Sequence, residues 1–193
     1  MPKIFSEQER ELIRTKLLKA GIRELEIKSY RNIAIDSIAA EVGIAKGTFY
    51  NFFPSKEAYF YAIMQFIKER NRDELKEMVL SKEIQKDDVV TCLYHRYTKI
   101  KTVYDYFSTE EMKIIMRKLP NGDEMNDSVE FAEWICHNLS VSEKEKAEVI
   151  VNMCNIMAIA ASNRDMFEPS AYEQAILVFC NAIADFMFQK EGK

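Results

Sequence analysis

A lysine, a glycine, a threonine and a tyrosine lie close together in the segment 45–53, which reads AKGTFYNFF. The Lys46 ammonium and the Thr48 hydroxyl are hydrogen-bond donors that can reach base edges or phosphate oxygens. Gly47 has no side chain and therefore lets another backbone approach closely. Tyr50 combines an apolar ring with a hydroxyl that can bind phosphate. This combination favours recognition of an anionic, hydrogen-bonding partner such as a nucleic acid.

Two short helices and a tight turn are needed to position these side chains. Apolar residues recur three and four positions apart at Ile35, Ile38, Ala39 and Val42. That spacing predicts a helix over 35–42, and Gly43 follows where a left-handed residue suits glycine. A second helix is expected from Ala45 to Phe53, with Pro54 after it. Such a pair forms a helix-turn-helix, whose second helix enters the DNA major groove. The alternative is a compact helical corner whose aromatic side chains only fill a core.

The segment from Asp36 to Tyr59, DSIAAEVGIAKGTFYNFFPSKEAY, resembles the tetracycline-repressor (TetR) family of bacterial transcription regulators. The family pattern is an Ile-Ala pair, a Gly turn, Lys-Gly-Thr-aromatic-Tyr and Phe-Pro-Ser-Lys-Glu, found here at 38–39, 43, 46–50 and 53–57. The match covers roughly residues 6–60, and the remainder agrees only in length and helical character. The resemblance implies DNA contacts, largely to the backbone, at Lys46, Thr48, Tyr50 and Lys56.

The chain departs from the family pattern at three places. Ile33-Ala34 replaces the usual Thr pair, so the usual cap and phosphate-binding hydroxyl before the helix are missing, and Asp36 or Ser37 can supply part of that function. Ala45 stands where Ser is frequent, and Asn51 stands where a basic residue or His is frequent. Asn51 can pair with adenine through two hydrogen bonds, or it can face solvent. The operator sequence therefore cannot be transferred from relatives.

Composition predicts a chain built from long helices. Only 9 of the 193 residues are Gly or Pro, whereas average usage would give about 23. That scarcity excludes turn-rich β-sandwiches, collagens and Pro/Gly-rich disordered segments. We expect an all-α fold of about nine helices, with a three-helix helix-turn-helix DNA-binding domain over residues 1–54 and a helical ligand-binding and dimerisation domain over 55–193. Body helices are expected near 55–80, 87–106, 109–118, 123–138, 142–163 and 170–189. Capping-box spacing occurs at Ser6/Glu9, Ser108/Glu111, Ser142/Glu145 and Ser170/Glu173.

Charge is distributed unevenly along the chain. The net charge is -4, but residues 1–56 hold 10 Lys and Arg against 7 Asp and Glu. The other residues hold 17 Lys and Arg against 24 Asp and Glu. A basic N-terminal third on an acidic body indicates that one end meets an anionic partner.

Motifs for other function classes do not occur in the sequence. There is no phosphate-binding loop, dinucleotide fingerprint, zinc-protease motif or nucleophile elbow, and the two histidines have no triad partners. We therefore expect no enzyme, no cofactor and no metal. The four cysteines form no C-x-x-C pair and are expected as buried thiols, with Cys92/His95 or Cys136/His137 as a weaker metal alternative. Because neither a signal peptide nor a long uncharged apolar run occurs, a cytoplasmic protein without a membrane span is expected.

The last two expected helices are apolar on nearly every side, over 147–161 and 175–188. Such helices must be covered on more than one side, and a second copy of the chain can cover the outer one. The resemblance implies the same homodimer, a four-helix bundle of these helices. A fully internal helical hairpin is the alternative. The candidate interface residues are Ala158, Phe179, Ile183 and Phe186.

Aromatic and methionine side chains in the middle helices can line a pocket for a flat or greasy ligand. Asn152 and Asn155, polar on an apolar helix, can orient such a ligand or bond across the dimer. Ordinary core packing is the alternative for each of these residues. The candidate ligand-binding residues are Tyr94, Tyr97, Tyr104, Phe107, Met116, Trp134, Asn152 and Met153.

Together these features predict a DNA-binding transcriptional regulator. The expected form is a homodimeric repressor on a near-palindromic operator of double-stranded DNA, released by a small hydrophobic or aromatic effector. The alternatives are a ligand-independent DNA-binding protein or activator, and a helical protein-interaction module.

Overall fold

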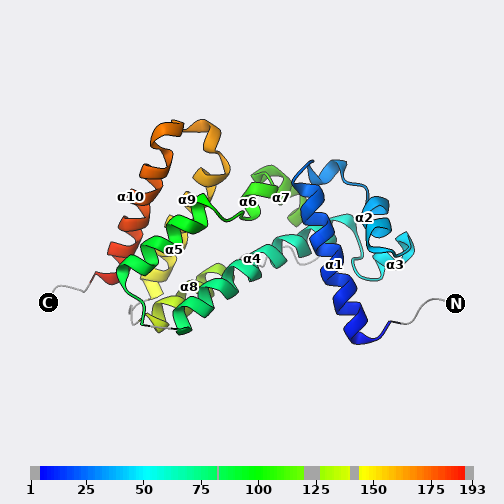
Figure 1. Cartoon of the computed structure of the whole chain (residues 1–193), viewed down its shortest axis with the longest axis horizontal. Coiled ribbons are helices and arrows are strands. Elements are labelled where there is room, and N and C mark those ends of the chain that lie inside the picture. The colour runs from blue at the N-terminus through cyan, green and yellow to red at the C-terminus, as the bar shows by residue number, and fades with distance from the viewer. Residues whose placement is uncertain (1–4, 82, 120–126, 140–143, 190–193) are drawn as a thin grey trace. The chain divides into compact units, whose positions relative to one another are not determined.

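The computed structural model describes residues 5–81, 83–119, 127–139 and 144–189. Within these ranges the chain is helical without strands, so the expected all-α fold is confirmed (Figure 1). The elements are α1 (Glu7–Leu25), the 3-10 turn η1 (Tyr30–Asn32), α2 (Ile35–Val42), α3 (Lys46–Tyr50), α4 (Lys56–Ser81), α5 (Lys86–Thr98), α6 (Val103–Tyr106), α7 (Thr109–Arg117), α8 (Asp127–Asn138), α9 (Lys144–Ser162), the 3-10 turn η2 (Arg164–Met166) and α10 (Pro169–Phe188).

Helix starts follow the capping pattern in two of the expected places. The Ser6 hydroxyl accepts a hydrogen bond from the Glu9 backbone N–H at 3.2 Å, and the Ser108 hydroxyl does the same for Glu111. The expectation for Ser170 is wrong, because α10 begins one residue earlier, at Pro169. Proline suits the first turn of a helix, where its missing N–H leaves no bond unmade. The pair at 142 and 145 lies outside the described residues.

The helix expected over 87–106 is two helices rather than one. The backbone N–H groups of Lys99 and Ile100 both bond to the His95 carbonyl, which closes the end of α5. Thr102 then starts α6, since its backbone N–H and its hydroxyl donate to the Asp105 carboxylate at 2.7 and 2.9 Å. The side chain of Asp105 therefore separates two helices where the apolar pattern runs on.

The chain divides into two compact units, and α4 runs from one into the other. The first unit comprises residues 1–69 and 106–122, and the second comprises 70–105 and 123–193. The first turns of α4 belong with the first unit, called the head below, because Tyr59, Phe60 and Ile63 are fully buried in its core. The assignment of functions to residues 1–54 and 55–193 stays a prediction.

An aromatic cluster forms the core of the first unit. The rings of Phe49 and Tyr59 meet edge to face with centroids 5.0 Å apart, and Tyr59 and Phe60 do the same. The Tyr59 hydroxyl donates to the Leu17 carbonyl at 2.6 Å. Gly21 makes room for it, since a Cβ at this position would lie 2.3 Å from the tyrosine oxygen. The cluster joins α1, α3 and α4 into one rigid head.

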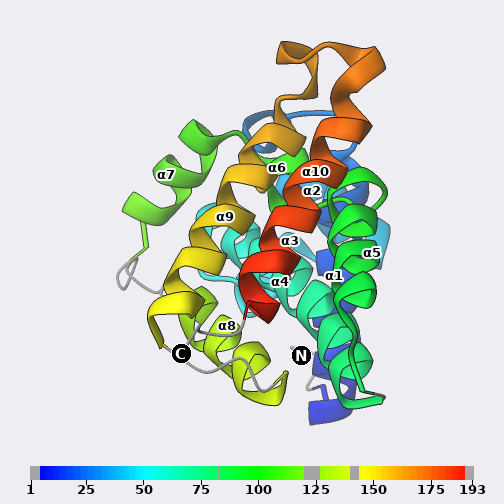
Figure 2. The same ribbon diagram turned by 90° about the vertical axis from the view of Figure 1, so that its left-hand side faces the viewer.

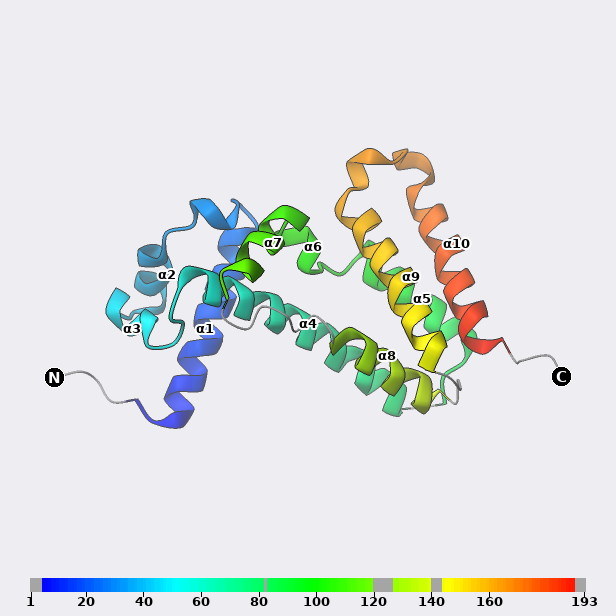
Figure 3. The same ribbon diagram turned by 180° about the vertical axis from the view of Figure 1, so that it is seen from behind.

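The helix α7 belongs to the same unit and is tied to the head at two points. The Lys118 ammonium, just past its end, bonds to the Glu57 carboxylate at 2.6 Å. The Ser29 hydroxyl donates to the Glu111 carboxylate at the other end. Figure 3 shows α7 beside the beginning of α4.

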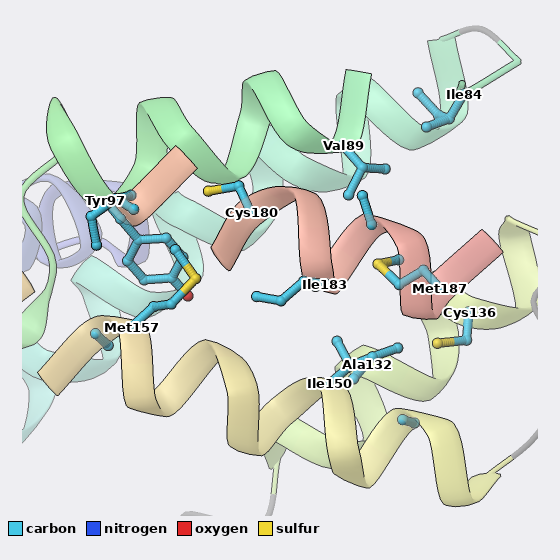
Figure 4. Close-up of a cluster of buried hydrophobic side chains, with 14 of the residues drawn as sticks. Ile84, Val89, Tyr97, Ala132, Cys136, Ile150, Met157, Cys180, Ile183 and Met187 are labelled. Atoms are coloured by element: carbon cyan, nitrogen blue, oxygen red, sulfur yellow. The ribbon is translucent and has the colours of Figure 1, made fainter. Parts of the chain in front are cut away.

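The second unit is built around α10. This helix packs against α5 and α9, and the three lie side by side in Figure 2. Cys180, Ile183 and Met187 lie on its inner face among the buried side chains shown in Figure 4. By length and composition α10 is also the one described helix that could cross a membrane. Its inner face, however, is packed within the unit as in a core helix.

The remaining packing in the second unit joins α8 to the later part of α4. The Arg72 guanidinium lies 5.0 Å from the centroid of the Phe131 ring. Phe131 in turn stacks with Trp134 at 6.2 Å. Cation–π contacts of this kind fix α8 along α4.

Candidate nucleic-acid interface

The turn between α2 and α3 has the geometry of a helix-turn-helix. Gly43 ends α2 with φ 78°, in the left-handed region, as the sequence predicts. The backbone N–H of Ile44 bonds to the Ala39 carbonyl at 2.9 Å, which closes the turn. α3 begins three residues after Gly43 and is shorter than expected, ending at Tyr50. Two short helices with this connection match the DNA-reading motif.

The helix α3 is held by one side and open on the other. Phe49 is fully buried in the aromatic core of the head. Lys46, Gly47, Tyr50 and Asn51 are exposed, and Thr48 is half-buried. These five exposed or half-buried residues are the ones that the sequence predicted as DNA contacts on this helix. Because Phe49 anchors the helix to the core, the five remain accessible to a partner.

Gly47 lies in open space. A Cβ built at this position would meet no atom within 4 Å. The packing of the head therefore does not require glycine here, in contrast to Gly21. A side chain at position 47 would therefore obstruct a partner that approaches α3.

Lys46 forms an ion pair with a residue of the preceding helix. Its ammonium lies 3.0 Å from Asp36 Oδ1 and 3.1 Å from Oδ2. The hydrogen bond to Asp36, and then its negative charge, raise the pKa of Lys46. The N-cap of α2 is Ala34, and no side chain caps this helix. Asp36 thus does not replace the missing cap, and it binds the lysine of α3 instead.

Lys56 is held inside the head. Its ammonium donates to the carbonyls of Arg31 and Ile33 at 2.9 and 2.7 Å. It also lies 5.9 Å from the centroids of the Tyr30 and Phe60 rings. Burial lowers the pKa of Lys56. Two of its three N–H groups are used internally, which leaves one for an outside acceptor. Its contact with DNA stays a prediction.

Two arginines of α1 reach the end of α3, which the sequence did not indicate. Arg10 lies over the Phe52 ring at 4.9 Å, and its Nη2 reaches the Asn51 carbonyl at 3.5 Å. Arg14 lies over the Phe53 ring at 5.3 Å. The only local signal is that the two arginines are four apart and share a helix face. Their partners lie about forty positions away, beyond any spacing rule.

The candidate ligand-binding residues do not form one group. Tyr97 is buried in the core cluster of the second unit, with Tyr94, Tyr104 and Met153 packed against that cluster. Trp134 stacks on Phe131, outside that cluster. Asn152 is exposed. The remaining two, Phe107 and Met116, belong to the first unit.

Hydrogen bonds already occupy the two tyrosine hydroxyls of α5 in this set. The Tyr97 hydroxyl donates to the Cys154 carbonyl at 3.0 Å. The Tyr94 hydroxyl donates to the Glu173 carboxylate at 2.7 Å, and this bond to the charged carboxylate raises the pKa of Tyr94. These two residues therefore have a structural role, and their contact with a ligand stays a prediction.

A different asparagine has the properties sought in Asn152 and Asn155. Asn71 on α4 is 3% exposed, and its Oδ1 accepts no hydrogen bond within the described residues. Asn152 and Asn155 are both exposed. A buried acceptor without a partner carries a free-energy cost that a ligand donor can remove. The sequence gives no sign of this, because α4 is charged on both sides of Asn71.

The candidate interface residues also separate into two kinds. Phe179 is 51% exposed, whereas Ile183 is 1% exposed and lies in the interior of the unit. Ala158 is buried, and Phe186 packs against the core cluster. The outer faces of α9 and α10 instead present the apolar side chains of Val149, Ile156, Ile159, Leu177, Val178 and Phe179.

The cysteines are free thiols in apolar surroundings. Cys136 and Cys180 are buried, and Cys92 and Cys154 are partly so. Burial raises the pKa of all four thiols, to about 11 for Cys180. Among the described residues no cluster of His, Cys, Asp or Glu has the geometry of a metal site.

Comparison with known proteins agrees with this geometry. The model of the family described as "Bacterial regulatory proteins, tetR family" matches residues 17–63, which include α2, the turn and α3. A curated relative, the uncharacterized HTH-type transcriptional regulator YvdT of Bacillus subtilis (strain 168), is 28% identical over a match covering 56% of this chain and 68% of that protein.

The fold has a solved counterpart. The crystal structure of a TetR transcriptional regulator from Rhodococcus sp. RHA1 is similar with a TM-score of 0.58 and 18% identity, over 97% of this chain and 100% of that one. At this identity the likeness concerns the fold. With the helix-turn-helix, the family match over residues 17–63 and the curated relative, it leads to one conclusion: residues 17–63 match the DNA-binding domain of the tetR family of bacterial regulatory proteins, and the chain is similar to DNA-binding transcriptional regulators of that family.

Proposed function

We propose that this chain is a cytoplasmic repressor that binds a near-palindromic operator as a homodimer and is released by a small hydrophobic or aromatic effector. The observation that carries the DNA-binding surface is the open face of α3. Phe49 anchors the helix, while Lys46, Tyr50 and Asn51 surround a glycine that has free space above it. That arrangement supplies donors for phosphates and bases and permits close approach of a DNA backbone.

The contacts divide by chemistry. Lys46, Thr48 and Tyr50 offer donors suited to phosphate oxygens, and Lys56 has one N–H group remaining. Asn51 lies at the C-terminal end of α3, exposed, and can pair with adenine. Phosphate contacts set affinity and make it depend on salt, whereas base contacts set specificity.

The homodimer is supported by the outer faces of α9 and α10. Val178 and Phe179 on α10 are exposed, as are Ile156 and Ile159 on α9. Apolar side chains grouped on one face favour a protein partner over water. Asn152 and Asn155 lie exposed on α9 among them, in a position to bond across the dimer. A symmetric dimer presents two α3 helices to two half-sites of a palindrome.

The effector site is supported by Asn71 and the aromatic residues of the second unit. An effector that donates a hydrogen bond to Asn71 Oδ1 would give that buried oxygen a partner. Tyr104 and Met153 are partly buried against the core cluster, and the flexible methionine side chain can adapt to a ligand. The effector can lower operator affinity only by as much as it prefers the DNA-incompetent state.

Selection of bound fragments from the source genome tests the DNA-binding function. Purified chain should enrich a small set of fragments that share a near-palindrome. Lys46→Ala should then weaken operator binding and reduce the salt slope by about one. Enrichment of no fragment would contradict the function and favour a protein-interaction module.

Effector release needs a separate measurement. A panel of aromatic and apolar compounds is screened by thermal shift, and hits are then titrated into the operator complex. Hits should lower operator affinity, and Asn71→Leu should abolish the effect of those that carry a hydrogen-bond donor. Compounds that bind tightly without changing operator affinity would contradict release by an effector.

A further inference from the structure

The ion pair between Asp36 and Lys46 places a carboxylate on the DNA-reading motif itself. Asp36 lies in the first turn of α2, and Lys46 is the first residue of α3. Both carboxylate oxygens lie within 3.1 Å of the ammonium. The two side chains are 65% and 57% exposed, so the pair faces outward rather than filling the core.

An exposed pair of this kind is weak and exchangeable. Ion pairs between exposed side chains contribute little to folding, because water and salt screen them. The pair is therefore not needed to hold α2 against α3, because both helices are already anchored by fully buried side chains, Ile38 on α2 and Phe49 on α3. The Asp36 carboxylate instead holds Lys46, the first residue of α3.

A carboxylate beside a phosphate-binding lysine needs a new hydrogen-bond donor from the DNA when the lysine moves to a phosphate. A phosphate oxygen that takes Lys46 replaces one anion with another and leaves Asp36 unpaired near the DNA backbone. An ionised carboxylate only accepts hydrogen bonds, and phosphates have none to donate. Donors for it exist on base edges in the major groove, at the amino groups of cytosine and adenine.

Resting on the DNA-binding function proposed above, we propose that Asp36 is a specificity-determining residue that acts by positioning Lys46. The Asp36 carboxylate weakens binding to DNA that contacts the protein through phosphates alone. It permits binding to DNA whose base amino group donates a hydrogen bond to Asp36 after Lys46 has moved to a phosphate. Removing the carboxylate then increases non-specific binding more than operator binding.

The test compares Asp36→Asn with Glu41→Gln. Glu41 also lies on α2 and forms an exposed ion pair, with Arg23, so this variant removes the same charge from the same helix. Each protein is titrated with its selected operator and with a scrambled fragment of equal length, between 50 and 200 mM salt. Over this range a protein that makes six or more phosphate contacts loses DNA affinity by about a thousandfold or more. Thermal unfolding checks that both variants keep their fold.

Asp36→Asn should tighten binding to the scrambled fragment roughly two- to fivefold at low salt, in line with the weak coupling of exposed pairs. It should also steepen the salt slope by about one as Lys46 becomes free for phosphate. Operator affinity should not rise, so the specificity ratio falls. Asp36→Glu should restore the parent ratio, and in a Lys46→Ala background Asp36→Asn should act no more strongly than Glu41→Gln.

Equal changes in Asp36→Asn and Glu41→Gln would show an effect of net charge and overturn the inference alone. Equal weakening on both fragments, with an unchanged ratio, would show a structural role and do the same. Failure of the parent chain to bind any fragment would overturn the proposed function, and this inference with it.

Discussion

The helices α3 and α10 each bury one face, yet their outward faces differ in kind. α3 is anchored by Phe49 and presents Lys46 and an unobstructed Gly47. α10 is anchored by Cys180 and Ile183 and presents Val178 and Phe179. The inward faces follow the same rule of apolar burial. The outward faces therefore carry the functional information: donors and free backbone suit a polyanion, whereas exposed apolar side chains suit another protein surface.

The largest effect is expected where a charge enters the inner face of α10. Ile183→Glu should lower the free energy of unfolding by roughly 3–5 kcal/mol, because an unpaired carboxylate would lie in the core. Phe179→Glu, four residues earlier on the outer face, should leave chain folding nearly unchanged and convert the proposed homodimer into a monomer. Chemical denaturation and sedimentation measure the two effects. An intact dimer in Phe179→Glu would place the interface elsewhere.

A similar contrast separates the glycines of the head. Gly21→Ala should lower the free energy of unfolding by roughly 1–3 kcal/mol, as overpacking does in other cores. The added methyl would collide with the Tyr59 hydroxyl and with Ile63. Thermal or urea unfolding measures the loss. Unchanged stability would mean that Tyr59 does not need the space at Gly21.

The two lysines should separate stability from binding. Lys56→Met removes hydrogen bonds to two backbone carbonyls of the head and should cost roughly 1 kcal/mol of unfolding free energy. Lys46→Met, on an exposed pair, should leave the unfolding midpoint within error and weaken DNA binding. Denaturation curves and fluorescence anisotropy on the operator provide the two readouts. Equal losses of stability would remove the distinction between an internal and an outward lysine.

Much of the head could be predicted from the sequence because its signals are local. The 3–4 apolar spacing gave α2, the turn glycine adopts the left-handed conformation, and Ser6 caps α1. The role of Lys56 could not be predicted, because its acceptors lie 23 and 25 positions away in the chain. The exposure of a side chain can be predicted from the local sequence only when its helix has one polar and one apolar face.

The C-terminal helices show where that limit lies. α10 is apolar nearly all round, so periodicity could not distinguish Phe179, which is exposed, from Ile183, which is buried. The asparagines fail in the same way: Asn152 stands out in an apolar sequence yet is exposed, while Asn71 is hidden among charged residues and is buried. Tertiary packing decides each of these cases.

The most direct test of the account is the operator affinity of Gly47→Leu, measured together with its unfolding free energy. Leucine favours helix, and position 47 has free space, so stability should stay within about 0.5 kcal/mol of the parent. The side chain would block the backbone approach, and loss of even one charged hydrogen bond should weaken binding at least about tenfold. A stable Gly47→Leu chain that binds the operator as tightly as the parent would contradict the assignment of α3 as the DNA-reading surface.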